Sequence, residues 1–196
     1  MSGSFKGIDV IAPGDHICAI QTSLRRDEVL LAFLRDGLVA GHRCVAALTE
    51  DLNDLQRRRL GSHADVERWL ATGQLELRAA SDTVTSPTTS STATMIDFWK
   101  TAQAPDPDPD GYECTRLAVE AGWWLPQLSN ITQMLSFESV LNRLSARHSA
   151  ATLCMYDVSD LDGALLMDLI RTHPRLIIEA EPVNNPAYLP EEYFHE

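Results

Sequence analysis

The sequence predicts an α/β fold, with a mostly parallel central sheet in a three-layer αβα arrangement. Short apolar runs alternate with segments in which apolar residues recur every three or four positions, the pattern of strands followed by amphipathic helices. The alternation extends along the 196 residues, a length that suits one domain over residues 1–196. Repeated strand–helix–strand units need crossover connections, which place parallel strands between two helical layers.

The first unit spans residues 16–48. A short apolar strand over 16–20 precedes a helix that Ser23 can cap. Apolar residues recur along this helix at intervals of three and four: Leu30, Phe33, Leu34 and Leu38. They fall on one face, and Gly41 ends the helix before a second apolar strand over 44–48.

The second strand is followed by Thr-Glu-Asp at 49–51. A hydroxyl and two carboxylates suit the start of a helix, because they can cap its free amides and oppose its dipole. Gly61 interrupts this helix. A second short helix over 65–71 leads into a third strand over 74–80.

Two segments without hydrophobic periodicity follow. Residues 81–94 are rich in Ser and Thr and contain a proline, which predicts a flexible loop, either a surface excursion or a lid over a site. A short helix is expected over 94–103. The stretch "APDPDPDG" at 104–111 predicts a stiff acidic linker, because its prolines forbid helix, and it lacks the ligand spacing of a calcium loop.

The second half opens with a strand over 114–120 and a loop over 121–127. Asn130 to Gln133 has the spacing of a capping box, so a helix begins there. Its apolar face carries four residues: Leu135, Val140, Leu141 and Leu144.

The last elements are a strand, a helix and a strand. Residues 151–157 are almost wholly apolar, as expected of a strand buried on both faces. A helix starting near Asp160 ends at His173-Pro174. A final strand over 175–181 precedes a proline-rich, irregular tail.

The charge balance excludes some function classes. Sixteen basic residues against twenty-eight acidic ones give a net charge of −12, and Arg57-Arg58-Arg59 is the longest basic run. Binding to nucleic acid or to an anionic membrane surface needs clustered basic charge, so neither is expected. No apolar run approaches the roughly 20 residues that span a bilayer, and the first ten residues do not resemble a signal peptide. The expected location is the cytoplasm.

The four cysteines, Cys18, Cys44, Cys114 and Cys154, each fall in an apolar strand-like run. Reduced cysteine behaves as a small hydrophobe in such positions, which argues against a disulfide framework. No C-x-x-C spacing supports a metal or redox cluster, although one built across neighbouring strands stays open. We expect no cofactor and no metal ion.

Several motifs resemble one known family. "GDHICAI", an amphipathic helix and "GHRCVAAL" stand near the start, and "ATLCMYD", "LLMDLIRTHPRLII" and "NNPAYLPEEYF" near the end. Between them, "SFESVLNRLS" is similar to the family's Tyr-Glu helix motif, with Phe137 before Glu138. Together these motifs look like the MEDS domain, a DcmR-like sensory domain, from about Gly14 to Phe194.

The resemblance implies a RecA/KaiC-like core that has lost its phosphate-binding loop. It implies an input domain of histidine kinases and transcription regulators that senses ligands, with hydrocarbon derivatives proposed, and that is not an enzyme. This chain departs from the family in having Gln21 where an aromatic residue is common, an Asp-Pro linker before the fourth strand, and Val119-Glu120-Ala121 after it.

The residues of the turn after the first strand also indicate that the phosphate loop is missing. Such a loop uses glycines to turn backbone amides toward phosphates, and a lysine and a hydroxyl to meet the terminal phosphate and its magnesium ion. The turn after Ile20 has no glycine, and no lysine occurs between it and Lys100. Hydrolysis of a nucleotide is therefore not expected.

Acidic residues remain at the carboxyl ends of strands, where open α/β sheets bind ligands: Glu50, Asp51 and Glu120. They are candidates for a vestigial site. The alternative is helix capping by the first two and an ion pair between Glu120 and Arg116.

His16 is a further candidate because Asp15 precedes it. A carboxylate beside an imidazole can fix its tautomer and raise its pKa, as in a sensor or a metal ligand. The alternative is a histidine bonded to a backbone carbonyl. Haem is not expected, since no C-x-x-C-H is present.

Trp123 and Trp124 follow the fourth strand and could wall an apolar pocket, or pack their loop against the core. The complete predicted ligand site is as follows: Asp15, His16, Gln21, Glu50, Asp51, Arg116, Glu120, Trp123, Trp124, Glu138 and Asp157.

Three functions stay open. The first is a sensory domain that binds a small molecule in a sheet-edge cleft and regulates a histidine kinase, an anti-sigma factor or a transcription regulator, with ordering of residues 81–94 as its output. The second is a ligand-free protein–protein interaction module. The third is a degenerate nucleotide-binding, ATPase-like protein. A homodimer is compatible with each of them.

Overall fold

A computed structural model of the protein describes residues 11–83, 96, 99–102, 111–122, 131–178 and 181–194. In this part of the chain, seven strands form one sheet in the order β3-β2-β4-β5-β1-β6-β7. The strands are β1 (His16–Gln21), β2 (Arg43–Leu48), β3 (Leu75–Ala79), β4 (Thr115–Glu120), β5 (Ala150–Asp157), β6 (Arg175–Ile178) and β7 (Glu181–Asn184). All neighbouring strands are parallel except β6 and β7, so the predicted mostly parallel sheet is confirmed.

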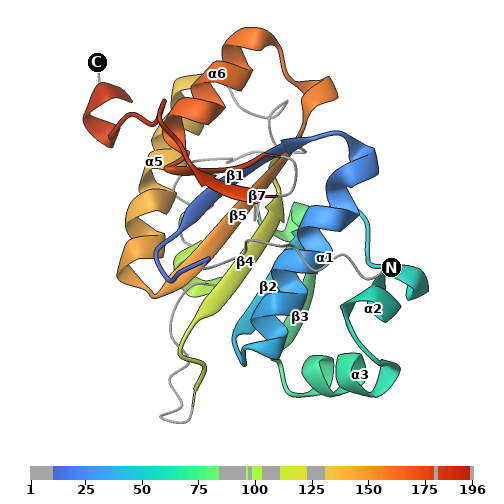
Figure 1. Cartoon of the computed structure of the whole chain (residues 1–196). Coiled ribbons are helices and arrows are strands. Elements are labelled where there is room, and N and C mark those ends of the chain that lie inside the picture. Colours follow the sequence, from blue (N-terminus) through green and yellow to red (C-terminus); the bar gives the residue numbers. More distant parts are fainter. Residues whose placement is uncertain are drawn as a thin grey trace.

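Helices cover both faces of the sheet. They are α1 (Ser23–Val39), α2 (Asp54–Leu60), α3 (His63–Ala71), α5 (Ile131–Arg147) and α6 (Gly163–Thr172), with short 3-10 turns at Ala80–Thr83, Val158–Asp160 and Glu191–Phe194. Helix α1 packs on one face and α5 and α6 lie on the other, which gives the predicted three layers (Figure 1).

Strand alternation explains why the core divides into two clusters. Successive side chains of a strand point to opposite faces of its sheet. In β1 and β5, Ile17 and Leu153 pack with the residues of α1, whereas Cys18 and Cys154 pack with those of α5. The same period of two turns His16 toward α5, and this orientation positions the site described below.

The starts of two helices differ from the prediction. Thr22, not Ser23, is the N-cap of α1, and its side chain makes no capping hydrogen bond. Residues 49–51 do not begin a helix, because α2 starts at Asp54 with a capping box between Asn53 and Gln56. The backbone amide and hydroxyl of Thr49 instead donate to the carboxylate of Glu120 on a neighbouring strand. The predicted helix cap at residues 49–51 is absent, and Thr49 makes these contacts with the sheet instead.

The C-terminal prediction missed one strand. Strand β6 ends at Ile178, and β7 pairs antiparallel with it. Pro182 lies opposite Ile177 in this pair. Proline has no N–H for a further ladder, so it suits the outermost strand of a sheet.

Other predicted segments are described only in part. Residue 96 and residues 99–102 of the predicted 94–103 helix are helical. Most of the predicted Ser/Thr loop over 81–94, the Asp-Pro linker up to residue 110 and the Asn130 cap lie outside the described residues. The four cysteines are all described, and each is free and buried as predicted. Within the described part of the chain, no helix has the length and apolar character needed to cross a membrane.

Arg116 is buried near the amino end of β4 and connects the sheet to α1 through contacts with Phe33. Its Nη1 donates to the carbonyl of Phe33 at 2.9 Å, and its guanidinium lies 5.2 Å from the centroid of the Phe33 ring. Gly37 of α1 permits this close packing. A Cβ added there would lie 2.5 Å from Cδ of Arg116 and 2.7 Å from Sγ of Cys44.

We therefore expect Gly37→Ala to lower the free energy of unfolding by about 1–3 kcal/mol, as overpacking of a core usually does. Alanine is otherwise favoured over glycine inside a helix by about 1 kcal/mol, so the sign of the change tests the packing. Gly163→Ala is the control, because a Cβ there meets nothing within 4 Å. Urea unfolding measures both, and equal stability of the two variants would contradict the close contact.

Candidate functional site

The predicted site residues do not form a single cleft. Gln21, Glu120 and Asp157 are the last residues of β1, β4 and β5, and they meet at the carboxyl edge of the sheet. His16 and Arg116 lie near the amino ends of their strands instead. The prediction that both groups border one sheet-edge cleft is wrong, because a parallel strand of six residues is roughly 17–20 Å long.

Glu120 forms the centre of the carboxyl edge. Its carboxylate pairs with Arg26 in the first turns of α1 and accepts hydrogen bonds from the backbone and hydroxyl of Thr49. The side chains of Arg26 and Glu120 are 17% and 14% exposed. The predicted ion pair between Glu120 and Arg116 is therefore wrong. Glu120 links α1, β4 and the end of β2.

Gln21 lies at the same edge with its amide group buried. Neither Nε2 nor Oε1 of Gln21 has a hydrogen-bond partner, and Nη2 of Arg26 has none either, within the part of the chain that the structure describes. Buried polar atoms without partners are costly, so such atoms at the carboxyl edge of an α/β sheet mark a place where a polar ligand can bind.

The remaining acidic residues of this edge have local roles. Asp51 is exposed; its Oδ1 accepts from the amide of Leu52 and its Oδ2 from Arg57. Asp157 accepts from the amide of Ser159 at 2.9 Å and caps a 3-10 turn. Glu50 is exposed. Trp123 and Trp124 lie outside the described residues.

Asp15 is not the partner of His16. Its carboxylate accepts from the amide of Ala12 at 2.7 Å and forms an ion pair with Arg175. Adjacent residues of a strand point to opposite sides, so a carboxylate that comes directly before His16 cannot share its face. The predicted pairing is wrong, and the carboxylate facing His16 comes from α5.

That carboxylate is Glu138, the centre of a buried polar cluster. Its Oε2 lies 3.3 Å from Nε2 of His16 and 3.3 Å from Nε2 of His173. Its Oε1 accepts a hydrogen bond from the hydroxyl of Tyr156. The Sγ atom of Cys154 lies 3.3 Å from Nε2 of His16 and 3.8 Å from Oε2 of Glu138. All five residues are at most 1% exposed.

The cluster joins elements that are distant in sequence. His16 begins β1, and its register partner Thr152 places Cys154 and Tyr156 on the same face of β5. Glu138 comes from the buried face of α5, and His173 caps the C-terminus of α6. Four elements of the fold therefore meet at one carboxylate, on the side of the sheet that α5 and α6 cover (Figure 1).

The charges of the cluster follow from burial and from its members. Burial opposes ionisation of Glu138, but the neighbouring imidazoles of His173 and His16 outweigh burial and hold the pKa of Glu138 well below its usual value. Burial and the neighbouring His173 lower the pKa of His16. Burial and the carboxylate of Glu138 raise the pKa values of Cys154 and Tyr156. A buried anion thus faces imidazoles and two protonated groups.

Sequence reasoning found only part of this cluster. It singled out His16 and Glu138, but treated Cys154 as a small hydrophobe and His173 as a helix end. One signal was available: polar or sulfur-containing residues stand two apart in His16-Ile17-Cys18 and in Cys154-Met155-Tyr156. Residues two apart on a strand share a face, so two such strands side by side predict a polar patch inside the core.

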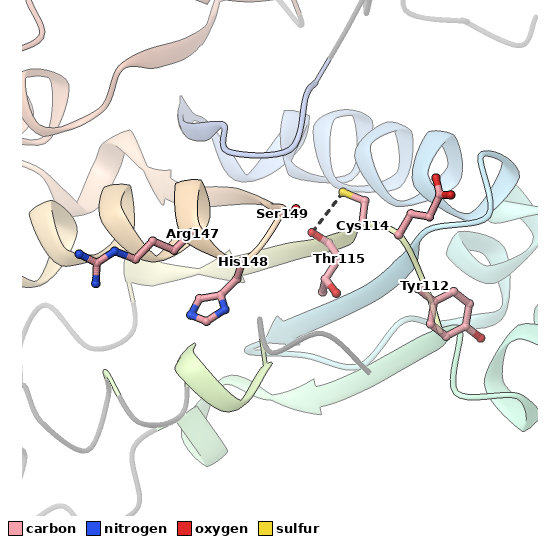
Figure 2. Close-up of a pocket in the computed structure, with 7 residues that line it drawn as sticks. Tyr112, Cys114, Thr115, Arg147, His148 and Ser149 are labelled. Carbon is pink, nitrogen blue, oxygen red and sulfur yellow. Dashed lines mark hydrogen bonds between the residues drawn. The ribbon is translucent and has the colours of Figure 1, made fainter. Parts of the chain in front are cut away.

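A surface hollow of about 160 Å³ lies at the opposite, amino-terminal edge of the sheet. Figure 2 shows its lining, from the start of β4 and the turn after α5, with Cys114, Thr115 and His148 among the residues. Glu113, Arg147 and Ser149 of this lining are exposed. None of the described lining side chains holds a buried polar atom without a partner, so this hollow does not compete with the other two places.

Comparisons with known proteins identify a family and a structural relative. The model of one family, the MEthanogen/methylotroph, DcmR Sensory domain (MEDS), matches residues 15–174. Among curated proteins, no match is found. The chain is similar in structure to the flagellar accessory protein FlaH from Methanocaldococcus jannaschii, with a TM-score of 0.55 and 13% identity over 88% of this chain and 76% of that one. At that identity the likeness shows the fold alone, and the predicted RecA/KaiC-like α/β fold is confirmed.

The hydrogen bond from Tyr156 to Glu138 gives a direct test of the cluster. Tyr156→Phe leaves one oxygen of a buried carboxylate without its donor, so the free energy of unfolding should fall by about 1.5–3 kcal/mol, the range for hydrogen bonds to charged groups. Tyr193→Phe is the control, since Tyr193 is 65% exposed and should tolerate the change. If urea unfolding finds both variants equally stable, Tyr156 does not support the carboxylate.

Proposed function

This chain belongs to the MEDS family of sensory domains, and on that basis we propose that it binds a small molecule at the carboxyl edge of its sheet and reports occupancy to a separate signalling protein. The proposed partner is a histidine kinase, an anti-sigma factor or a transcription regulator. The proposed role is recognition without turnover.

One observation carries the proposal: the buried amide of Gln21 and the buried Nη2 of Arg26 have no partners in the described part of the chain. Together they offer a hydrogen-bond acceptor and several donors at the end of β1, an inner strand of the sheet. An organic molecule with an oxygen-bearing end fits these groups, because it can accept from Arg26 and from the amide and donate to the amide oxygen. A polar derivative of a hydrocarbon has this chemistry.

The connection between β1 and α1 disfavours the nucleotide alternative. Strand β1 ends at Gln21 and α1 begins at Ser23, so Thr22 alone lies between them. A phosphate-binding loop needs several residues, with glycines that let consecutive amides face the phosphates. Arg26 is a partly buried cation just after this turn, and its charge is already paired with the carboxylates of Asp27 and Glu120.

The same contacts suggest how occupancy could change the protein. Arg26 and Glu120 connect α1 to β4, and Thr49 adds the segment that follows β2. A ligand that pairs with Arg26 and Gln21 changes the balance of these contacts. It can then shift the population of conformations by as much as its affinities for them differ, which is the physical requirement for signalling.

Native mass spectrometry of the purified protein, compared with the denatured chain, tests the proposal first. A mass excess that disappears on denaturation supports a retained ligand and gives its mass. A bare mass, followed by no change in Tm across a screen of alcohols, carboxylic acids and amides, favours the ligand-free interaction module instead. The native spectrum also shows whether the protein is a dimer.

Millimolar Mg-ATP and Mg-ADP provide the test of the nucleotide alternative. We expect neither to raise Tm, because the turn between β1 and α1 offers no phosphate cradle. A ligand that binds the native state stabilises it by mass action, so an increase in Tm that grows with nucleotide concentration would contradict the proposal.

Gln21→Met separates binding from stability. Methionine keeps the length of the side chain and removes its unpaired polar atoms, so the free energy of unfolding of the ligand-free protein should stay equal or rise by up to about 1 kcal/mol. The response to any ligand found in the screen should be lost.

The matched control is Gln74→Met. The amide of Gln74 donates to the carbonyls of Leu38 and His42, at 3.0 and 3.2 Å, so this variant should be destabilised by about 1–3 kcal/mol. If Gln21→Met is destabilised as much as Gln74→Met, the amide of Gln21 has a structural role and the proposed binding place is wrong.

A further inference from the structure

We propose that His16, Glu138, Cys154 and His173 form a buried site for one divalent metal ion of the zinc type. The site is separate from the carboxyl edge, and the proposal does not rest on the ligand proposed there. It rests on three features of the cluster: the positions of the donor atoms, the tautomers of the two histidines, and the charge of the site.

The four donor atoms are close enough to share one ion. One ring nitrogen from each of His16 and His173, one carboxylate oxygen of Glu138 and Sγ of Cys154 all lie within 4.8 Å of one another. The closest separations are 3.3 Å for three of the pairs and 3.8 Å for the sulfur and the carboxylate oxygen. Tetrahedral zinc, with bonds of about 2.0–2.3 Å, places its ligands roughly 3.3–3.8 Å apart. Small movements of the side chains would complete this geometry.

The hydrogen bonds of His173 leave its Nε2 available as a metal ligand. Nδ1 lies 2.7 Å from the carbonyl oxygen of Leu169, which can only accept, so Nδ1 carries the hydrogen. In the neutral ring, Nε2 then has a lone pair. This atom is fully buried and has no hydrogen-bond partner in the described chain, although it lies 3.3 Å from Oε2 of Glu138.

His16 has the same arrangement through Asn142. The amide nitrogen of Asn142 donates to the carbonyl of Thr172 at 2.9 Å, so its Oδ1 faces Nδ1 of His16 at 2.8 Å. Nδ1 of His16 is therefore the donor, and in the neutral ring Nε2 presents its lone pair to Glu138 and Cys154. With both rings neutral, two lone pairs face one carboxylate oxygen, and this repulsion is relieved by a positive charge between them, either a proton on one ring or a metal ion bound by all three groups.

A metal ion supplies that charge and balances the site. Glu138 is 0% exposed, and the ion-pair contacts of this carboxylate within the described residues are with histidines alone. When a divalent cation binds, Cys154 loses its proton to solvent and becomes a thiolate. The ion then carries two positive charges against one carboxylate and one thiolate, with two neutral imidazoles, so the buried site has no net charge.

The surroundings are those of a metal site as well. Histidines that bind metals usually donate their other ring N–H to a carbonyl or carboxylate, which fixes the ring. Leu169 and Asn142 accept such bonds here, and Tyr156 donates to the second oxygen of Glu138. Four protein ligands leave no open position, so the ion holds β1, β5, α5 and the end of α6 together and does not act as a catalyst.

The experiment uses the full chain, unfolded with a chelator and refolded with Zn²⁺ or Co²⁺. We expect one equivalent of either ion to remain bound through gel filtration, measured by inductively coupled plasma mass spectrometry. The Co²⁺ form should show the visible bands of tetrahedral cobalt and a thiolate-to-cobalt charge-transfer band in the near ultraviolet. The refolded protein without metal should have a lower Tm than either loaded form. Failure to retain either ion overturns the proposal.

Cysteine variants assign the thiolate. Cys154→Ala should abolish the charge-transfer band, whereas Cys44→Ala should keep it, because Cys44 is buried on the other face of the sheet, in the cluster with α1. Circular dichroism confirms that each variant is folded. A band that survives in Cys154→Ala, or that disappears equally in both variants, overturns the assignment.

Glu138→Gln provides a second test of metal binding if other variants fail to fold. Its amide nitrogen can donate to an imidazole Nε2, so the cluster stays hydrogen-bonded without a cation. The metal-free variant should fold, while its metal affinity should fall by more than the roughly 10–100-fold lost with an outer-shell partner. Unchanged affinity overturns the proposal. Gln21→Met should bind metal like the wild type, so failure of the edge ligand and failure of the metal site can be told apart.

Discussion

The ionised carboxylate of Glu138 is the constraint on which this side of the molecule depends. A charge removed from water is costly unless it is paired and hydrogen-bonded. Here Tyr156 on β5 donates a hydrogen bond to the carboxylate, and the imidazoles of His16 on β1 and His173 at the end of α6 lie against it, where the proposed metal ion would complete the compensation. Because side chains from all three elements contact the same carboxylate, Glu138 constrains how α5 and the end of α6 pack against the sheet.

The two faces of the sheet therefore have different chemistry. The face covered by α1 packs with apolar side chains such as Ile17, Phe33 and Leu153. The other face has an apolar cluster of its own and the polar group around Glu138. A parallel sheet between two helical layers makes this division possible, because alternate residues of each strand belong to separate interiors.

The carboxyl edge shows how a RecA-like fold can exist without its phosphate loop. Thr22 alone connects β1 to α1, and the first turns of α1 carry Arg26 to Glu120. Glu120 also takes the hydrogen bonds of Thr49. Protein contacts fill this part of the edge, while the amide of Gln21 stays unpaired within the described residues. An ion at the Glu138 cluster and a ligand at this edge would act on opposite ends of β1.

The sequence by itself determined the fold class, the order of most elements and the absence of a phosphate loop, because periodicity, glycines and prolines act locally. It also identified His16, Gln21, Glu120 and Glu138. Only the tertiary structure decided which of these residues meet. It paired Glu120 with Arg26, and it brought Cys154 and His173 to Glu138 across gaps of 16 and 35 residues. Such partners depend on strand order and helix packing, which no local pattern specifies. The antiparallel β7 was missed for the same reason. Its strand conformation depends on backbone pairing with β6, and its own residues show little strand propensity.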